Sequence, residues 1–557
     1  MYIDKIKVKT GKKVHVQILL RESFREPGAP RSQVKHRTLL NLTHHDPKDI
    51  AAIKLALKHK NDLAKLKSLA KTEIKITQGL SVGAVWALWC VAQRVGLVSV
   101  LGGSQEARRV LWQVFARLIN QGSRLSAVRL AGEHAACEIL GLSSFDENDL
   151  YDSLDWLDAR QAKIEDALYQ RRNSDGAPQL FLYDVTSSYL EGTENEYAAW
   201  GYNRDKKKGK LQIVVGLLSD GSGNPLSIEV FEGNTQDTQT VCSQVRKLAE
   251  RFGAGAVTLV GDRGMLKTAQ IAELSEESFH YLTAITKPQI ESLLKKGVFQ
   301  LGLFEEKLCE VRDGGVRYIL RRNPARAAEI AMNRADKFRS LASLVLKKND
   351  YLALHLRADI KVALRDVLAY AKKLRISDWV LIEADGRAIK VEQDAVSLAQ
   401  VSRLDGCYAL KTDVPTQAAD AATLHTRYKD LAQVEQAFRE MKTGHLEVRP
   451  VYVRTAAHTR AHVFIVMLAY LLRRELDAAW RKLNLTVEEG LSQLSSLCSE
   501  EISFGDSSGY LSVPIPRESL ARLFTALSIT PPPSLPPSLP RIHPPVATKR
   551  KLPSRRK

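Results

Sequence analysis

Residues 1 to 45 alternate between apolar and polar positions in three short runs that glycine and proline separate, which predicts a small N-terminal β unit. From Pro47 to about Arg172 the apolar spacing becomes that of amphipathic helices. Examples of these expected helices are 51–69, 82–95, 108–119 and 150–169. We therefore expect a helical region over residues 46–175.

The pattern changes again at Gln179. The expected elements are strands at 180–185, 211–218 and 225–231, a helix at 237–252, a strand at 256–260, a helix at 266–274 and a strand at 281–286. An antiparallel hairpin followed by alternating strands and helices predicts an α/β fold with a mixed sheet covered by helices. Residues 176–290 form its first part.

The chain then makes a detour over 291–405, which we interpret as an α+β insertion. Its expected elements are a hairpin (307–311 and 316–321), helices between Ala325 and Leu374, and strands near Val380 and Ile389. A strand at 407–411 and a long helix at 418–442 return to the sheet domain, which ends within 406–500. Residues 501–530 form a C-terminal segment, and the Pro-rich basic stretch 531–557 is expected to be a disordered tail.

The excess of basic residues indicates the class of binding partner. Lys and Arg outnumber Asp and Glu by 82 to 63 in 557 residues, and the hydrophobic fraction is 44%. This is a globular composition with a preference for polyanions, of which nucleic acid is the commonest, although ribosome- and membrane-surface binders share it. The helical region has basic faces that are either solvated or dock DNA, formed by Arg108, Arg109, Arg117, Arg124 and Arg129.

The chain shows no targeting signal that we recognise. No apolar stretch follows the first charges, the run Val463 to Leu472 is too short for a bilayer span and predicts a buried helix, and the six cysteines are scattered. We expect a protein of the reducing cytoplasm, without membrane contact, zinc knuckle or disulfide framework.

Three carboxylates are candidates for chemistry. Asp184 lies on a strand that is apolar on both faces and therefore central, where it is either bonded structurally or functional. Asp262 follows an apolar strand and could be a helix N-cap. The order of the elements, however, places that strand beside the one with Asp184, so that both side chains can face one cleft.

The third carboxylate is Glu435 on the expected long helix. Tyr428, Glu435 and Lys442 are spaced by seven and form one stripe, beside a core-facing stripe of Leu431, Val434, Phe438 and Met441. Glu435 at the edge of the buried face could reach the cleft or pair with Arg439 on the surface. Glu440 is expected to be solvated.

Carboxylates from a central strand, the end of its neighbour and a flanking helix suit two divalent ions that promote in-line phosphoryl transfer. Hard oxygen ligands with room for water and phosphate favour Mg²⁺, with Mn²⁺ as a substitute. Asp184, Asp262 and Glu435 are thus the expected catalytic residues and metal ligands.

These motifs resemble insertion-sequence DDE transposases of the "IS-four" superfamily, in its long-insertion branch. The matching motifs are Asp184-Val185-Thr186, then Val260-Gly261-Asp262-Arg263-Gly264, Tyr428, Glu435 and Lys442 in register, and the segments 435–439, 446–452 and 461–462. The family has Arg where this chain has Leu431, and Arg439 is a candidate to replace it. The likeness is strong over about 180–475.

The resemblance implies a ribonuclease H-like core with a DDE triad. It implies that the N-terminal region binds terminal inverted repeats, and that Tyr428, Lys442, Arg439, Arg449 and His462 are candidate DNA contacts, His462 being structural or phosphate-binding. It further implies a homodimer in the synaptic complex, cleavage of the element's ends, transfer of the 3′-hydroxyl to target double-stranded DNA, and a bacterial protein that associates with the nucleoid.

Two rival functions stay open on the sequence. A nuclease or junction resolvase of the same fold would cut DNA without joining it. A non-catalytic derivative would only bind DNA. The intact triad argues against this interpretation, whereas Leu431 at the family's Arg position argues for it.

Overall fold

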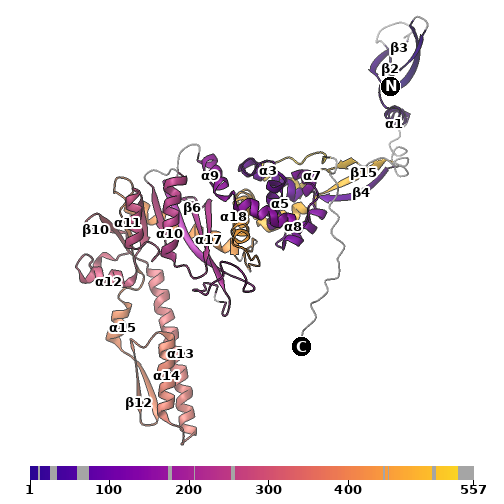
Figure 1. Ribbon diagram of the computed structural model, residues 1–557. Coiled ribbons are helices and arrows are strands. Elements are labelled where there is room, and N and C mark those ends of the chain that lie inside the picture. The colour runs from indigo at the N-terminus through magenta and orange to yellow at the C-terminus, as the bar shows by residue number, and fades with distance from the viewer. Residues whose placement is uncertain are drawn as a thin grey trace.

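The computed structural model describes residues 1–10, 13–25, 34–58, 60, 74–173, 179–205, 207–252, 257–442, 444, 446–449, 451–504 and 510–536. In Figure 1 the N-terminal unit stands apart from a body that contains the large sheet and the helical region, and an arm formed by the insertion projects from the sheet end of that body.

The N-terminal unit is a three-stranded antiparallel sheet of β1 (Tyr2–Thr10), β2 (Lys13–Arg25) and β3 (Val34–Asn41) in the order β1-β2-β3. The alternation of apolar and polar residues predicted these strands, and the structure confirms them. Helix α1 (Pro47–Lys58) follows. Most of the second half of the helix expected at 51–69 lies outside the described residues.

The helical region follows in the chain. Its helices are α3 (Gly83–Arg94), α4 (Leu97–Leu101), α5 (Gln105–Ile119), α6 (Arg124–Glu133), α7 (Ala136–Leu140), α8 (Glu147–Asp158) and α9 (Gln161–Arg172). The single helix expected at 150–169 is wrong, because the chain breaks at Ala159-Arg160 into α8 and α9. A capping box at Asp146 starts α8, where its side chain accepts hydrogen bonds from two backbone N–H groups.

A small sheet joins this region to the end of the chain. Strand β4 (Ile74–Ser81), which the sequence prediction missed inside the helical region, pairs antiparallel with β15 (Cys498–Phe504), and β15 pairs with β16 (Tyr510–Ser512). Residues 531–536 are not part of a disordered tail as expected. Leu535 is buried, and its N–H donates to the carbonyl of Leu511. Residues 537–557 lie outside the described residues.

The large sheet has eight strands in the order β10-β11-β14-β9-β8-β5-β6-β7. They are β5 (Leu180–Tyr189), β6 (Gln212–Asp220), β7 (Pro225–Glu232), β8 (Thr258–Gly261), β9 (His280–Ala284), β10 (Cys309–Asp313), β11 (Val316–Arg322) and β14 (Cys407–Thr412). Strand β5 pairs antiparallel with β6 and parallel with β8. An antiparallel hairpin on one side of a central first strand and parallel strands on the other confirm the mixed sheet of a ribonuclease H-like core.

Helices cover both faces of this sheet (Figure 1). Side chains of β5 alternate between two separate cores, with Leu182 in one and with Phe181 and Tyr183 in the other. The first core contains α17 and α18, and the second contains α10. The covering and connecting helices are α10 (Asp237–Arg246), α11 (Thr268–Glu276), α12 (Lys287–Lys295), α16 (Ala421–Lys429), α17 (Leu431–Lys442), α18 (Ala456–Trp480), α19 (Val487–Ser495) and α20 (Glu518–Ala526).

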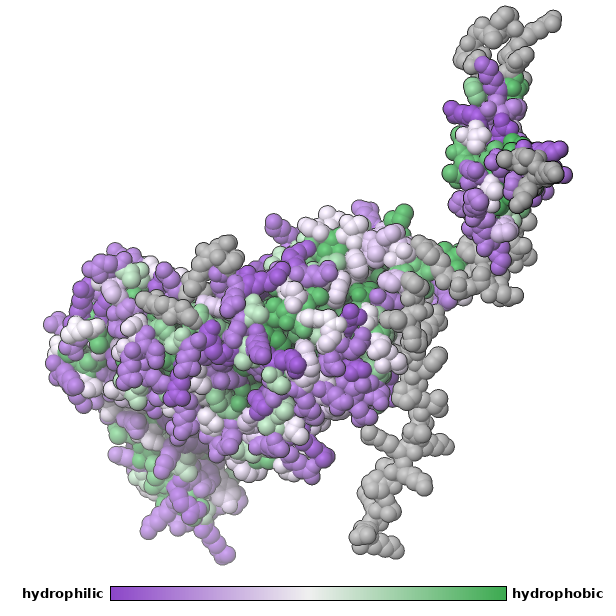
Figure 2. All heavy atoms as spheres, turned by 45° about the horizontal axis from the view of Figure 1, so that its top comes forward, coloured by the Kyte–Doolittle hydropathy of each residue, from purple (hydrophilic) through white to green (hydrophobic). Residues whose placement is uncertain are grey.

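Helix α18 is the expected buried helix. The run Val463 to Leu472 lies entirely in the core, between the sheet and the helical region. Because α18 packs against β7 as well as α3, α5 and α8, one helix supports both parts of the body. Within the described residues, no helix has the length and apolar character needed to cross a bilayer. Hydrophilic residues cover most of the face seen in Figure 2.

The insertion forms the projecting arm. It comprises α13 (Pro324–Leu354), α14 (Ile360–Leu374), β12 (Val380–Asp385), β13 (Ala388–Gln393) and α15 (Ala395–Ser402), which share a hydrophobic core of their own. The hairpin β10–β11, which the sequence assigned to the insertion, instead extends the large sheet through β14. The arm therefore leaves the sheet at Arg322 and returns at Cys407.

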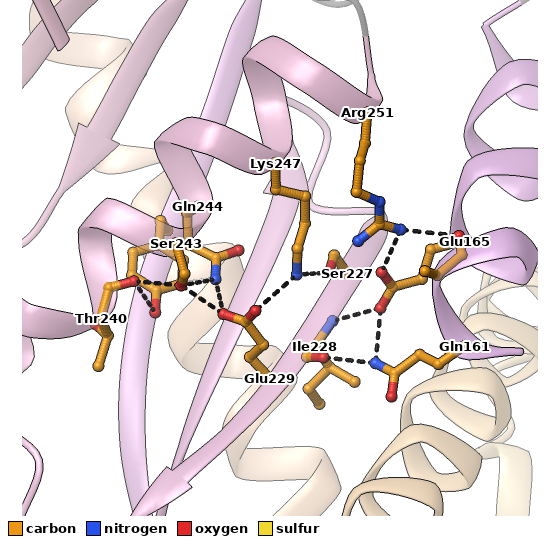
Figure 3. A network of polar contacts seen from close by, with 12 residues as sticks. Gln161, Glu165, Ser227, Ile228, Glu229, Thr240, Ser243, Gln244, Lys247 and Arg251 are labelled. Atoms are coloured by element: carbon orange, nitrogen blue, oxygen red, sulfur yellow. Dashed lines mark hydrogen bonds and ion pairs between the residues drawn. The ribbon is translucent and has the colours of Figure 1, made fainter. Parts of the chain in front are cut away.

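A polar network joins the helical region to the edge of the sheet (Figure 3). Glu165 of α9 is almost fully buried, pairs with Arg251 at 3.0 Å and accepts hydrogen bonds from Gln161 and from the backbone N–H of Ile228 on β7. Lys247 donates to Ser227 at 2.6 Å on the same strand. Because Arg251 and the N–H of Ile228 bind Glu165 from outside α9, the network fixes α9 against β7.

Candidate active site

Asp184 lies in the middle of the central strand β5. Its carboxylate accepts a hydrogen bond from the N–H of Val185 at 2.8 Å, and it is half-buried at the floor of a cleft. Strands β6 and β8 flank β5, so the position of this carboxylate is fixed by hydrogen bonding on both sides. The expectation of a central strand here is confirmed.

Asp262 follows β8 directly, and Gly261 lies opposite Tyr183 in the parallel register. Asp262 is therefore adjacent to Asp184 across the two strands, as expected. It is not an N-cap, because α11 begins six residues later at Thr268. Its backbone carbonyl accepts from Thr283 at 3.2 Å, and its carboxylate lies 3.5 Å from the hydroxyl of Tyr428. The side chain thus faces the cleft.

Glu435 lies on α17, and the single helix expected at 418–442 is wrong. The chain breaks at Asp430, so Tyr428 belongs to α16 and Glu435 to α17. The predicted core stripe is confirmed, since Leu431, Val434, Phe438 and Met441 are all buried. Glu435 is exposed beside this stripe and lines the cleft.

The three carboxylates lie around one open cleft of about 330 Å³. Burial, with smaller contributions from the charges of Asp262 and Glu435, raises the pKa of Asp184 to about 7 against the opposing effects of the Val185 N–H and Arg204. The charges of both other carboxylates therefore affect the protonation of Asp184. A strand, a strand end and a helix contribute one side chain each, in the arrangement that the sequence predicted.

The donor set of the cleft fits a hard divalent cation. It offers carboxylate oxygens, one of them in a poorly solvated position where a cation would relieve the repulsion that raises the pKa of Asp184. Among the residues that the structure describes, however, no three acidic, His or Cys side chains already converge on one metal position. Asp184, Asp262 and Glu435 are the residues of the cleft that would hold the ion.

The raised pKa of Asp184 predicts a pH-dependent stability of the metal-free protein. Between its ordinary value of 3.8 and about 7, the folded state binds a proton that the unfolded state lacks. In EDTA the free energy of unfolding is therefore expected to fall as pH rises through this window, by up to about 1.4 kcal/mol per pH unit. Urea unfolding at pH 5 and pH 7 measures the change. Asp184→Asn is expected to reduce it, and an equal fall in both proteins would contradict the assignment.

A second buried carboxylate, which the sequence analysis missed, lies in the wall of the cleft. The side chain of Asp205 is 3% exposed and forms ion pairs with Lys442, at 2.6 Å, and with Arg449. Lys442 also donates to the hydroxyl of Thr186 at 3.0 Å. Two candidate DNA contacts are therefore bound to one aspartate within the cleft wall. Asp205 begins a basic run, Lys206-Lys207-Lys208, that looks like a solvated loop, so nothing in the sequence indicated this role.

Arg204 and Asp237 also line the cleft. Arg204 donates to both carboxylate oxygens of Asp237, each at 2.7 Å. The sequence analysis missed this pair as well, because its members lie 33 residues apart in a loop and at the start of α10. Arg204 is the cation that lowers the pKa of Asp184.

Tyr428 lines a neighbouring pocket and reaches Asp262, and Arg439 lines the cleft itself. The hydroxyl of Tyr428 faces Asp262, and burial together with that carboxylate raises the pKa of Tyr428 well above its usual range, so the phenol stays protonated. Arg439 is exposed and lines the cleft. Leu431, at the position where the resembling family has Arg, is part of the core.

His462 and Glu440 lie elsewhere. His462 is buried on α18, where its Nε2 lies 3.2 Å from the carbonyl oxygen of Val448, and burial lowers its pKa well below the usual range. This environment corresponds to the structural reading of His462. Glu440 is not the solvated residue that we expected, since it pairs with Arg473 at 2.9 Å and accepts from Gln436 at 2.8 Å.

Comparisons with known proteins agree with this geometry. Residues 175–472, more than half of the chain, match the family model "Transposase DDE domain", and residues 3–70 match "IS1634 family transposase, N-terminal domain". No curated protein gives a match. A cryo-EM structure of the piggyBac transposase synaptic complex with hairpin DNA is similar at 8% identity and a TM-score of 0.36, over 73% of this chain and 75% of that chain, a level that supports no conclusion by itself. The family matches show that this chain belongs to the DDE transposases, enzymes that use divalent metal ions.

Proposed function

We propose that this transposase binds the terminal inverted repeats of its insertion sequence, cleaves the DNA ends and transfers the 3′-hydroxyl to target DNA. The observation that carries the proposal is the single cleft shared by Asp184, Asp262 and Glu435. These carboxylates would hold two Mg²⁺ ions, for which Mn²⁺ can substitute, and the ions supply activation of the attacking oxygen and stabilisation of the leaving oxygen.

The residues of the chain itself position the DNA in this proposal. Arg439, exposed at the cleft, would contact a phosphate directly. Lys442 and Arg449 would act as fixed positive charges, because Asp205 restrains both side chains in the wall. Tyr428 keeps its proton and can donate a hydrogen bond to a phosphate oxygen from beside Asp262. His462 is buried, and we assign it a structural role.

A basic pocket beside the cleft supports DNA as the substrate. It has a volume of about 470 Å³, is lined by Arg263, Lys287, Arg326 and Lys429, and includes Tyr428, which also approaches Asp262. A polyanion that enters the acidic cleft would thus meet positive charge immediately outside it. Arg326 lies in the first turn of α13, the first helix of the insertion arm.

We further propose that the protein acts as a homodimer in the synaptic complex, without membrane contact, in the bacterial cytoplasm and at the nucleoid when bound to DNA. The first 175 residues would recognise the terminal repeats, which the match of residues 3–70 to a transposase N-terminal domain supports.

Incubating the protein with Mg²⁺, a labelled linear DNA that carries the element's inverted repeats and a target plasmid tests this function. Joined products at the plasmid are expected. Products that are cut but never joined would establish the nuclease instead, and retarded but intact DNA would establish a binding protein. DNA with scrambled repeats serves as the control and is expected to be neither cut nor joined.

A further inference from the structure

Two arginines of the helical region line a pocket that the proposed chemistry does not use. Arg117 lies in the last turn of α5 and Arg124 at the start of α6, and both point into a cavity of about 290 Å³. We call it the arginine pocket; its other lining residues include Ser123, Tyr151, Tyr452 and His462. Arg449 lines both this pocket and the active-site cleft, so the two are neighbours.

The arginine pocket carries more positive than negative charge, because three arginines, Arg117, Arg124 and Arg449, and one carboxylate, Glu447, line it. Within the described residues, the Nε of Arg124 is buried and has no hydrogen-bond partner. The same guanidinium lies over the ring of Tyr151, 4.9 Å from its centre. In the part of the chain that the structure describes, Arg117 forms no ion pair, although Glu447, which lines the same pocket, attracts it. Among these described residues, neither Arg117 nor Arg124 therefore forms an ion pair with an acid.

The two guanidinium groups also repel each other. Burial and the charge of Arg124 lower the pKa of Arg117 to about 10, which leaves it charged at neutral pH. The pKa of His462 is lowered by burial and by both arginines, so this ring adds no charge. A pair of like charges in a poorly solvated pocket costs stability unless a ligand neutralises it.

The other arginines of the basic faces differ from this pair. Arg109 pairs with Asp149 at 3.0 Å, and Arg129 is exposed. Arg109 is therefore paired with an acid and Arg129 is solvated, while Arg117 and Arg124 line a cavity that is large enough for a ligand and its water. Planar guanidinium groups match the tetrahedral oxygens of phosphate, with two donors each.

We propose that the arginine pocket binds one backbone phosphate of the DNA whose end lies in the neighbouring cleft. This inference rests on the proposed function, because it takes DNA as the substrate. The pocket would fix the DNA on the α5–α6 side of the cleft, and the helical region would thereby contribute directly to positioning the cleaved end.

Exchange of both arginines for glutamine tests the pocket from the protein side. In EDTA, fluorescence anisotropy with a duplex of the terminal repeat is expected to give a Kd about tenfold to a hundredfold higher for Arg117→Gln/Arg124→Gln. The slope of log K against log salt is expected to flatten by about one to two. The matched control is Arg129→Gln on the surface of α6, with a change of less than about twofold. Equal effects of the double variant and the control would overturn the proposal.

Stability separates a binding role from a structural one. Removing two unneutralised buried charges is expected to leave the unfolding temperature of the DNA-free protein unchanged or higher. A lower unfolding temperature, with DNA affinity lost in proportion, would assign the arginines a structural role and overturn the proposal.

A test from the DNA side is independent of how the variants fold. Single methylphosphonate substitutions neutralise one phosphate of the repeat at a time. One position is expected to weaken binding about tenfold in the wild-type protein and to have no effect in the double variant, because both changes remove the same contact. Identical profiles for the two proteins would contradict the pocket.

A measurement with inorganic phosphate distinguishes a pocket for a DNA backbone phosphate from a pocket for the free anion. The unfolding temperature of the wild-type protein is compared in about 10 mM phosphate and in chloride of equal ionic strength. If phosphate raises it while the double variant binds DNA with normal affinity, the pocket is a free-anion site and the proposal fails. Failure of the proposed function has a different signature, in which wild-type protein binds the repeat through the pocket but does not cut or join it.

Discussion

Asp184→Asn is expected to lower metal-dependent cleavage of the DNA ends by about a thousandfold or more while DNA binding is retained. Asparagine keeps the volume of the side chain and an oxygen that can accept from the N–H of Val185. It lacks the negative charge that a divalent ion requires, and such an ion contributes several kcal/mol to the transition state. Cleavage of an end-labelled repeat in Mg²⁺, beside anisotropy in EDTA, measures the two properties.

The same loss is expected for Asp262→Asn and Glu435→Gln, because the three carboxylates would act as one unit. Combining any two of these changes is expected to reduce cleavage little beyond the single variants. Cleavage at the wild-type rate in Glu435→Gln would remove that residue from the active site and leave a different acid, such as Asp237, to be tested.

The control for this series has to be chosen from the structure. Glu440, which the sequence suggested, pairs with Arg473 and is unsuitable. Glu276 on α11 is exposed and belongs to the same domain without lining the cleft. Glu276→Gln is expected to cleave DNA within about twofold of the wild-type rate, as surface changes away from a site usually do.

Asp205→Asn is expected to destabilise the protein by about 3–5 kcal/mol, because it leaves the buried cations Lys442 and Arg449 without their shared counter-ion. The N–H of Tyr189 also donates to this carboxylate, at 3.2 Å, so the change weakens the link between the loop and β5. Urea unfolding monitored by fluorescence gives the free energy directly.

A second substitution identifies the cause. In Asp205→Asn/Lys442→Met the uncompensated charge is removed, and part of the lost free energy of unfolding is expected to return. The matched control is the exposed pair of Asp385 and Lys390, where Asp385→Asn is expected to leave stability unchanged. If the double variant loses as much free energy of unfolding as the two single variants together, the uncompensated buried charge is not the reason for the loss.

The central sheet and the cleft follow from local patterns in the sequence. Leu182 alternates with Phe181 and Tyr183 between two cores, and the apolar run that ends at Gly261 lies parallel to the same strand. Because strand polarity and helix periodicity are set within a few residues, they were sufficient to bring Asp184 and Asp262 together and to place Glu435 at the edge of a buried face.

The features that were missed depend on contacts between distant residues. Asp205 is buried only because Lys442 and Arg449 reach it from more than 230 residues away. Strand β4 lies within a stretch of helical sequence pattern, and its strand partner β15 comes only much later in the chain. The breaks at Ala159-Arg160 and Asp430 interrupt patterns whose periodicity continues across them, so the spacing of apolar residues did not reveal them.

The central position of α18 has a consequence for synthesis of the enzyme. Helices α3, α5 and α8 pack against α18, helices α3 and α5 also pack against α19, and β4 pairs with β15. A nascent chain that has emerged as far as the insertion arm still exposes the packing faces of these helices and an unpaired strand edge, which favour association with other chains or with chaperones. We therefore expect ribosome-bound or prematurely terminated products that lack α18 and β15 to aggregate, so that active enzyme accumulates only when translation has passed β15.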